Sequence, residues 1–508
     1  MRVHLPAACL AAGLAACGPF VENPAGPGTP PPPPPPGGPT VAVPFKLGTT
    51  QPDEGRAVAY TGTGIVLASW FTGTVDFDPS TTAATGKTSF GAQDIAVARY
   101  GLDGSFSWVF SIGGSGADVP NAMAATADGG VVVVGYGNGG GLCSGRVLTS
   151  AGGRDILLLR LGADGTCLWA QLLGGTGDDE ARGVAVAPDG TIYVVGSFSG
   201  TADFNDSGSF LLQSLGLTDG FLARFDADGT LLDAVRNGGT GDDRLNTVAF
   251  ASTGELTVGG EFTGTASFGT VLAPVLLQSA GGLDGSLARY TPLLGLRWAI
   301  RLGGLLEDRV TALTHDFDGS VLAAGSFEGS ADLDPGAGSA VLVSQGAADI
   351  FLARYDGQTG AWDGLARPFG GPGTESVNRI VRHISGRLLL TGLFQETADF
   401  DPGPGARLVP ARGTGGAGDA FVLGITSAGD LSWVTPIGGV VGGAGNISIG
   451  YDLATDDAGR VWATGRFFGR ADFDPGTEAV ELVAASQSDI YLSRYDIDTG
   501  VLRAEPLP

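Results

Sequence analysis

Histidine is almost absent from this chain of 508 residues, which contains only three. His4 lies in an N-terminal segment, and His315 and His383 lie near predicted turns one repeat apart, so no histidine pair has the spacing of metal ligands. The sequence also lacks a Gly-x-Ser-x-Gly elbow and a nucleotide-binding glycine loop that opens a helix. No reaction can therefore be inferred from its motifs.

Positive charge is scarce as well. Lys and Arg number 28 against 53 Asp and Glu, which gives a net charge of −25 and a pI near 4.3. Such a surface repels phosphate backbones, and this excludes nucleic acid as a partner. We interpret the acidic surplus as a solubility feature, with cation binding as the alternative.

Stretches with helical periodicity are missing, and no run in the body of the chain is apolar and long enough to span a membrane. Glycine is abundant instead, with 88 residues, and proline reaches 29. This composition is typical of many short strands joined by tight turns.

The N-terminus has the pattern of a secretory signal: Met1-Arg2, an apolar run from Leu5 to Ala16, and then Cys17. The segment Leu14-Ala15-Ala16-Cys17 resembles the bacterial lipobox. The resemblance implies a lipoprotein signal peptide over 1–16, cleavage before Cys17 and acylation of that cysteine. Gly18 stands where an inner-membrane retention signal would have Asp, which favours the outer membrane of the bacterial cell envelope. The alternative is an ordinary cleaved signal with a chance cysteine.

Residues 17–40 are interpreted as the lipidated cysteine and a Pro/Gly-rich tether. Pro30 to Pro36 are unbroken proline, which fixes φ and removes the backbone donor that helices and sheets need. At about 3.1 Å per residue, polyproline is a semi-rigid spacer. We expect it to hold the folded body away from the membrane.

The rest of the chain, 41–508, is repetitive. An aspartate opens a short apolar strand seven times, at a spacing of 61 to 70 residues: Asp94, Asp155, Asp219, Asp284, Asp349, Asp419 and Asp489. The third unit predicts four strands, over 183–187, 191–198, 221–225 and 231–236. Four antiparallel strands repeated radially predict an all-β, seven-bladed β-propeller. A terminal strand would close the ring, and both Val41–Leu47 and Val501–Pro506 compete for that place.

The repeat resembles the SBBP family of seven-bladed β-propeller proteins. The resemblance is carried by Gly174-Gly175-Thr176-Gly177-Asp178-Asp179, Val184-Ala185-Val186, Asp189-Gly190, Val194-Val195-Gly196, Asp203-Phe204 and the strand that Asp219 opens. It implies a fold and no particular activity, because that family's members mostly have no assigned activity.

Paired aspartates recur in the excursion between the second and third strands: Asp76/Asp78, Asp203/Asp206, Asp332/Asp334, Asp399/Asp401 and Asp472/Asp474. Aspartate makes turns through its own side chain, and the following proline fixes φ. Oxygen-rich loops also suit calcium, although nothing here matches the twelve-residue calcium loop. We predict turn-making pairs, with calcium bound at Asp76, Asp78, Asp332, Asp334, Asp399, Asp401, Asp472 and Asp474 as the alternative.

At six of the seven junctions between units, an acid follows the junction glycine by five residues: Gly48/Asp53, Gly113/Asp118, Gly174/Asp179, Gly238/Asp243, Gly303/Asp308 and Gly370/Glu375. The seventh junction, at Gly438, meets Gly443 instead. Because strands alternate in direction, we expect these acids, the Asp pairs and the strand-opening aspartates to share one face.

Two further series have structural interpretations. Trp108, Trp169, Trp298 and Trp433 each precede a junction glycine by five residues, which favours packing between blades over sugar stacking. Arginines recur near the end of the third strand, at Arg99, Arg160, Arg224, Arg289, Arg354 and Arg494.

Two cysteines, Cys143 and Cys167, remain beyond the anchor, and an exported protein permits a disulfide between them. However, the predicted strands place them at opposite ends of one blade, farther apart than an S–S bond reaches. The pairing stays open on the sequence alone.

The favoured function is a noncatalytic binding or scaffold propeller, tethered to the membrane by its lipid and facing an envelope protein or a glycan. One alternative is a polysaccharide-active propeller enzyme that uses carboxylates at the channel mouth. Another is a passive surface or adhesion protein.

Overall fold

The computed structural model describes residues 43–80, 85–205, 207–270, 273–413, 417–439, 447–474, 476 and 479–503. The chain divides into two compact units, 1–36 and 37–508. The predicted signal peptide over 1–16, Cys17 and the tether over 17–40 lie outside the described residues, as do Asp206 and Gly443. The description below therefore concerns the second unit.

Strand pairing organises the second unit into four-stranded antiparallel sheets. In chain order these are β2 (Glu54–Tyr60), β3 (Ile65–Phe71), β6 (Asp94–Tyr100) and β7 (Phe106–Ile112); β8 (Val119–Ala125), β9 (Val131–Gly137), β12 (Asp155–Leu161) and β13 (Cys167–Gly175); β14 (Glu180–Val186), β15 (Ile192–Phe198), β18 (Asp219–Phe225) and β19 (Leu231–Gly239); β20 (Arg244–Phe250), β21 (Leu256–Phe268), β22 (Val275–Tyr290) and β23 (Leu296–Gly304); β24 (Asp308–His315), β25 (Val321–Asp332), β26 (Val341–Tyr355) and β27 (Trp362–Phe369); β28 (Ser376–Arg382), β29 (Leu388–Phe394), β32 (Asp419–Ile425) and β33 (Leu431–Gly439); and β34 (Ser448–Thr455), β35 (Arg460–Asp472), β36 (Glu481–Asp496) and β1 (Phe45–Leu47).

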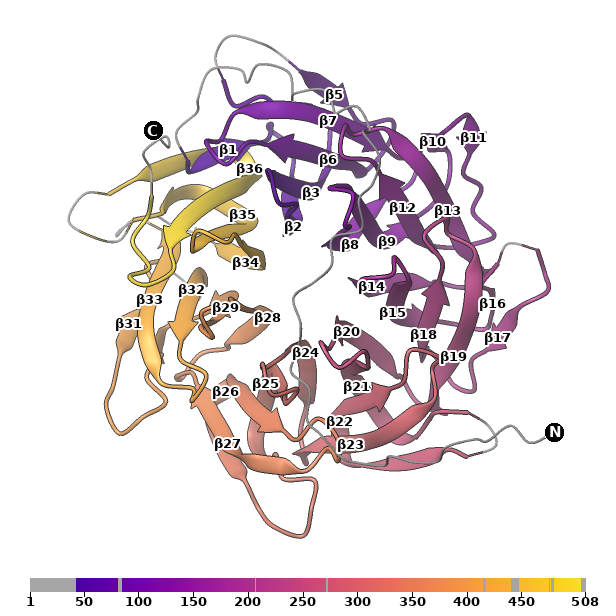
Figure 1. Cartoon of the computed structure of the whole chain (residues 1–508). Coiled ribbons are helices and arrows are strands. Elements are labelled where there is room, and N and C mark those ends of the chain that lie inside the picture. Colours follow the sequence, from indigo (N-terminus) through magenta and orange to yellow (C-terminus); the bar gives the residue numbers. More distant parts are fainter. Residues whose placement is uncertain are drawn as a thin grey trace, which may run out of the picture. The chain divides into compact units, whose positions relative to one another are not determined.

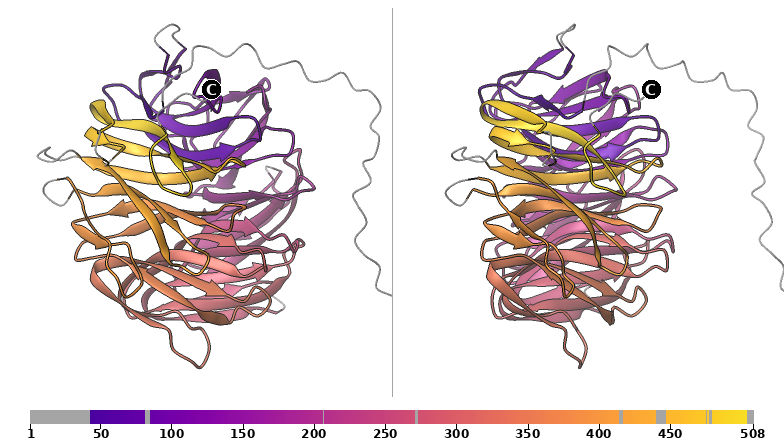
Figure 2. Two further views of the ribbon diagram at one scale, coloured as in Figure 1. Left: turned by 60° about the vertical axis from the view of Figure 1, so that its left-hand side comes forward. Right: turned by 90° about the vertical axis from the view of Figure 1, so that its left-hand side faces the viewer.

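These sheets stand as blades around one axis, with the first strand of each innermost (Figure 1). The side views show a disc whose blades lie one beside the next (Figure 2). No α-helix occurs among the described residues. The prediction of an all-β propeller is confirmed.

The hydrophobic core lies between neighbouring blades. One cluster joins Val134 and Leu158 of the second blade to Val194, Phe221 and Phe225 of the third, all at most 1% exposed. The second and third strands are buried on both faces, as in β3 and β15, where every residue is buried. Each blade therefore hides its apolar faces only because another blade packs on either side.

The regular tryptophans pack between blades, as the sequence predicts. The indole Nε1 of Trp298 donates to the carbonyl of Gly357, in the turn between the third and fourth strands of the next blade, at 3.1 Å. Trp108, Trp169 and Trp433 make the same bond, to Ala163, Ala227 and Ile497. Gly360 has φ +73°, and a Cβ there would lie 2.9 Å from the ring of Trp298, so this turn requires glycine.

Both chain ends build the fourth strand of the last blade. β1 pairs with β36, aligning Phe45 with Leu492 and Leu47 with Ile490. The C-terminal segment adds one bridge farther along, between Leu502 and Tyr495. The two predicted competitors for ring closure thus divide one strand between them, with β1 supplying the longer part.

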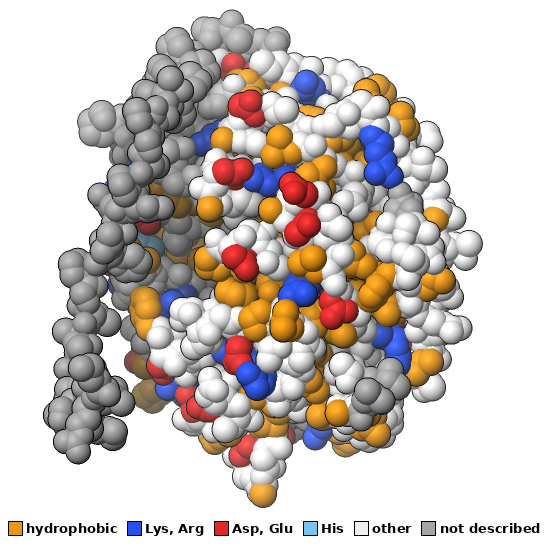
Figure 3. All heavy atoms as spheres, turned by 45° about the vertical axis from the view of Figure 1, so that its right-hand side comes forward, with side chains coloured by type: hydrophobic (Ala, Val, Ile, Leu, Met, Phe, Trp, Pro, Cys, Tyr) orange, Lys and Arg blue, Asp and Glu red, His pale blue; other side chains and the backbone are white. Residues whose placement is uncertain are grey.

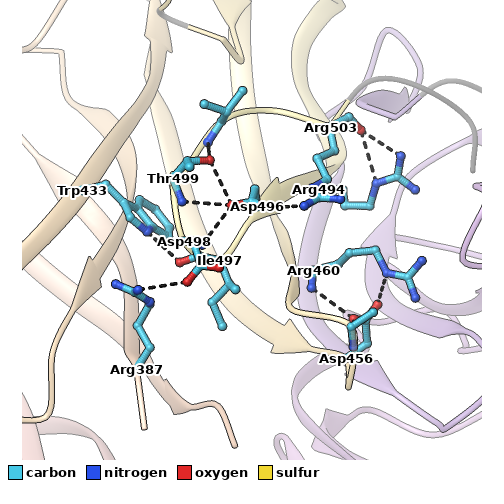
Figure 4. A network of polar contacts seen from close by, with 12 residues as sticks. Arg387, Trp433, Asp456, Arg460, Arg494, Asp496, Ile497, Asp498, Thr499 and Arg503 are labelled. Atoms are coloured by element: carbon cyan, nitrogen blue, oxygen red, sulfur yellow. Dashed lines mark hydrogen bonds and ion pairs between the residues drawn. The ribbon is translucent and has the colours of Figure 1, made fainter. Parts of the chain in front are cut away.

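The side chains of Phe45 and Leu47 enter the cluster between the last blade and the first. The C-terminal segment is held at the outer turn, where Arg494 Nη2 donates to the carbonyl of Arg503 at 2.9 Å, while Arg503 forms an ion pair with Asp496 (Figure 4). Arg494 also reaches the carbonyl of Leu102 in the first blade, at 2.8 Å. The recurrent arginine therefore has a structural role here.

The excursions after the second strands run back along the outer edges of the blades as extra hairpins: β4 (Thr74–Asp76) with β5 (Gly86–Thr88), β10 (Leu142–Cys143) with β11 (Arg146–Val147), β16 (Thr201–Asp203) with β17 (Leu211–Gln213), and β30 (Thr397–Asp399) with β31 (Leu408–Pro410). In the remaining blades, the strands of the extra hairpin are continuous with the second and third strands, which gives the long strands β21, β22, β25, β26, β35 and β36. Asp203 and Asp332 pair with the junction glycines Gly174 and Gly303 of the preceding blade.

Cys143 and Cys167 form a disulfide, with their Cα atoms 5.7 Å apart. The geometric argument against this bridge is wrong, because the excursion does not stay at the end of the blade where it starts. It descends along the blade, and Ser144 Oγ donates to the carbonyl of Cys167 at 2.5 Å. The hairpin β10–β11 thereby reaches the beginning of the fourth strand.

Candidate functional site

Every first strand contains a β-bulge at the same place, three residues after the junction acid or its equivalent. The bulge leaves one residue without a partner on the second strand, at Arg56, Asn121, Arg182, Asn246, Thr311, Asn378 and Tyr451. A bulge redirects the side chain of its extra residue. Because the first strands are innermost, all seven of these side chains turn toward the axis of the ring.

These seven side chains line a cavity of about 550 Å³ on that axis. Its wall continues outward with Trp70, Tyr136 and Glu261 from second strands, and with Gln93 just before a third strand. These residues lie at the ends of the strands from which the excursions and junctions emerge, which we call the junction face. The cavity therefore opens on the junction face, and its volume is in the range of small-ligand sites.

Hydrogen bonds from one blade to the next fix the bulge side chains. Asn121 Nδ2 donates to the carbonyl of Ala181 at 2.9 Å, and Asn378 Nδ2 donates to that of Gly450 at 2.8 Å. Asn246 and Thr311 make the equivalent bonds to Val310 and Val377. The cavity wall is thus a ring of positioned polar groups, since each acceptor lies on the neighbouring blade.

Charges at the cavity mouth are paired. Arg56 Nη1 lies 3.4 Å from Glu54, and Arg466 forms an ion pair with the same carboxylate. Arg182 pairs with Glu180. Arg244 and Arg309 each lie 3.3 Å from Glu261. No member of this group lacks an opposite charge.

Two aromatic faces at the mouth are covered by cations. The guanidinium of Arg56 lies 4.3 Å from the ring centre of Tyr451, and that of Arg154 lies 4.9 Å from Tyr136. Trp70 is buried and donates its Nε1 to Glu54 at 3.2 Å. These rings support the charged groups by cation–π contact and hydrogen bonding.

An ion pair lines a smaller cavity of about 60 Å³, which the seven bulge side chains also line. Arg379 Nε lies 3.0 Å from Asp452 Oδ1, and Asp452 Oδ2 accepts the backbone N–H of Val58 at 2.9 Å. Burial raises the pKa of Asp452, while Arg379 acts in the opposite direction. This contact joins the sixth, seventh and first blades below the cavity.

The junction acids are buried beside the strand-opening aspartates and do not line the cavity. Asp179 accepts the backbone N–H groups of Gly175 at 2.7 Å and Ser199 at 3.0 Å, and a Cβ on Gly174 would collide with Asp155 and Asp179. Burial is the main cause that raises the pKa of Asp179 to about 6, and repulsion from Asp155 adds to it. The pKa is about 6 at Asp118 and Asp243 and about 7 at Asp53, Asp308 and Glu375, with the same main cause.

The paired aspartates of the excursions make turns. Asp332 Oδ1 accepts the N–H groups of Asp334 at 3.1 Å and Ala340 at 2.8 Å, and Asp334 Oδ1 accepts that of Gly336 at 2.8 Å. The pairs at Asp76/Asp78, Asp399/Asp401 and Asp472/Asp474 have the same bonds. Within the described ranges, no group of three or more His, Cys, Asp or Glu is arranged to hold a metal. Calcium at these pairs stays a prediction.

The sequence pattern points to the excursions as candidate sites and does not mark the bulge residues. Their types vary from Arg and Asn to Thr and Tyr, so no repeated letter marks them. The available signal was an offset: in six units, a polar side chain follows the junction acid by three residues.

Acidic and basic side chains are interspersed with apolar ones on the side of the molecule shown in Figure 3. None of the described segments forms a helix with the length and apolarity needed to cross a membrane.

No protein-family model matches the chain. The chain is similar to the regulatory protein FlaEY of Caulobacter vibrioides, with 32% identity over 140 residues; the match spans 27% of this chain and only 14% of FlaEY. Membership of the SBBP family therefore stays a prediction.

Several solved structures are similar at low identity. The quinohemoprotein alcohol dehydrogenase ADHIIG from Pseudomonas putida HK5 has 12% identity and a TM-score of 0.39, over 92% of this chain and 77% of that one. The gluconolactonase XC5397 from Xanthomonas campestris has 15% identity and a TM-score of 0.29, over 70% and 95%. The GH43 protein BlXynB from Bacillus licheniformis has 10% identity and a TM-score of 0.26, over 90% and 96%. At these scores the likeness carries no argument about function.

Proposed function

We propose that this protein is a noncatalytic binding module of the bacterial cell envelope and that its ligand enters the central cavity on the junction face. The observation that carries the proposal is the set of bulges, which aim one side chain from every blade into a cavity of about 550 Å³. A polysaccharide-active site would need a carboxyl of raised pKa at the cavity. The junction acids with raised pKa are instead held in the walls between blades, and Asp452, whose pKa burial also raises, is buried in an ion pair with Arg379.

Filling the cavity tests this function. Thr311 faces the axis, and Thr311→Trp would place a bulky ring there. Detergent-extracted full-length protein is applied to arrays of glycans, peptides and envelope lipids. We expect a signal in the parent protein that falls at least tenfold in T311W.

Thr230→Trp is the matched control, because Thr230 is exposed in a turn on the opposite face. T230W is expected to keep the parent signal. Binding through the cavity would be contradicted if T311W left every array signal unchanged. It would also be contradicted if the parent protein bound no glycan, peptide or lipid on the arrays.

The location of the module rests on Cys17. We propose that this cysteine is acylated and holds the protein in the outer membrane, since the lipobox-like segment precedes it and a proline-rich spacer follows. Cys17→Ser is expected to abolish incorporation of labelled palmitate and to release the protein from sedimented membranes. Retention of both label and sedimentation in C17S would rule out the anchor; Cys9→Ser is the control and should behave as the parent.

A further inference from the structure

The mouth of the central cavity presents fixed hydrogen-bonding groups, and each of its paired arginines contacts a carboxylate. Glu180 and Glu261 face it as acceptors, and Arg182 and Arg309 face it as donors. An anionic ligand would need arginines without carboxylate partners, and a cationic ligand would need free carboxylates. Each arginine and glutamate at the mouth already has a partner of opposite charge, so neither condition is met, although Glu54 and Glu261 are each shared between two arginines.

The amide side chains add groups of both kinds. Asn246 uses its Nδ2 on the carbonyl of Val310 and Asn378 uses its Nδ2 on that of Gly450, so each keeps its Oδ1 as an acceptor. Gln93 and Tyr136 contribute further groups at the rim. Because these acceptors and donors surround one cavity and are positioned by neighbouring blades, they suit a ligand with many hydroxyl groups, each of which both donates and accepts.

A peptide fits these observations less well. An apolar side chain of a bound peptide needs an apolar pocket. This cavity is instead lined mainly by Arg, Asn, Glu and Gln. Its aromatic rings are buried or covered by guanidinium groups. An extended peptide backbone commonly adds to an open sheet edge. The edges of the first strands instead face the axis at a bulged, interrupted register.

We propose that the cavity binds an uncharged carbohydrate, such as the end of a neutral glycan, through the ring of arginine, glutamate and amide side chains. This inference rests on the proposed binding function and narrows its ligand class. Arg182 and Glu180 would contact adjacent hydroxyl groups of a sugar ring, in the manner of charge-assisted hydrogen bonds. The removal of either partner should weaken binding because the other is then left without its counter-charge.

The test compares two variants of one ion pair with a control. Full-length protein in detergent is titrated with a panel of neutral mono- to tetrasaccharides, together with matched uronic-acid and amino-sugar forms. We expect saturable binding of at least one neutral sugar and a loss of at least tenfold in affinity for both Arg182→Met and Glu180→Gln. Arg297→Met is the control, since Arg297 is 57% exposed and pairs with Glu255 near the opposite face; its affinity should equal that of the parent.

The outcomes separate the two proposals. If T311W abolishes an array signal but that signal comes from peptides, lipids or charged sugars only, the cavity binds a ligand and the carbohydrate inference is wrong. Neutral-sugar binding that survives R182M and E180Q also overturns it. Circular dichroism and the unfolding midpoint of each variant establish that a lost signal does not come from a lost fold.

Discussion

Replacing both Phe45 and Leu47 with alanine is expected to destabilise the whole propeller, by about 5 kcal/mol in the free energy of unfolding. Their side chains are 5% and 3% exposed and fill the contact between the last blade and the first. The ring of Phe45 lies 5.0 Å from that of Tyr100. Loss of β1 leaves β36 as an open edge and exposes apolar faces on two blades at once. Urea unfolding followed by tryptophan fluorescence measures the change.

Val501→Ala is the matched control, because Val501 belongs to the other chain end and is 55% exposed. It is expected to change the free energy by less than about 0.5 kcal/mol. Hydrogen exchange adds a local readout: in F45A/L47A, protection should fall first in β36, at Ile490 to Leu492. Equal stability of the two variants would mean that β1 does not hold the ring closed.

The repeat made the architecture predictable. A strand-opening aspartate every 61 to 70 residues, with turn glycines between apolar segments, defines four strands per unit, and these strands occur where the pattern placed them. The tryptophan series was predictable for the same reason, because a side chain that recurs at one offset serves a contact that recurs in every blade. The role of the Asp pairs in turns also follows from local side-chain chemistry.

The parts that the sequence did not reveal depend on departures from regular strand geometry. A bulge changes which way one side chain points, and the seven bulge residues differ in type, so alternation along the first strand does not identify the cavity wall. The disulfide depends on the path of an excursion that no periodic pattern constrains. The sharing of one strand by both chain ends depends on how far each end reaches along β36.

Stability is expected to fall as pH rises from about 5 to 8, because the folded protein raises the pKa values of its junction acids. These values are about 6 at Asp118, Asp179 and Asp243 and about 7 at Asp53, Asp308 and Glu375, above the ordinary 3.8 to 4.5. At a pH between the ordinary pKa values and these raised values, the folded chain binds more protons than the unfolded chain. The stabilisation is therefore complete below pH 4 and lost through pH 6 to 7.

Other carboxyls set the acidic limit. Hydrogen bonds from Thr166 lower the pKa of Asp164, and hydrogen bonds from Thr191 lower that of Asp189. The stabilisation from these two carboxyls is complete when the pH is above their pKa in the unfolded chain. It is lost as the pH falls through their lower pKa in the folded chain. We expect maximum stability between about pH 4 and 5, and a loss of at least about 3 kcal/mol by pH 8, which is what about two pKa units on only one of the six junction acids would give. A series of urea midpoints from pH 4 to 9 measures it; a midpoint that rises across this range would contradict the prediction.

A pair of aspartate-to-asparagine variants locates the source of this dependence. Asp155 lies beside Asp179 without a cation, since Leu172 occupies the place on the fourth strand where the next blade has Arg236. Arg236 Nη1 lies 2.7 Å from Asp219, the equivalent of Asp155. The first pair therefore carries uncompensated buried charge above pH 7, whereas the second is partly neutralised.

Asp155→Asn removes one of the two charges and still accepts the N–H of Ala151, which lies 2.6 Å from the aspartate oxygen. We expect D155N to gain about 1 to 3 kcal/mol at pH 8, because one pKa unit corresponds to about 1.4 kcal/mol. The gain should be smaller at pH 4.5, where Asp179, with a pKa of about 6, is already protonated and no longer repels Asp155. Asp219→Asn instead strips Arg236 of its partner and should give no gain at either pH. If D155N destabilises the protein at pH 8, or if both variants respond alike, then repulsion within the buried carboxyl pairs is not what makes the fold sensitive to alkali.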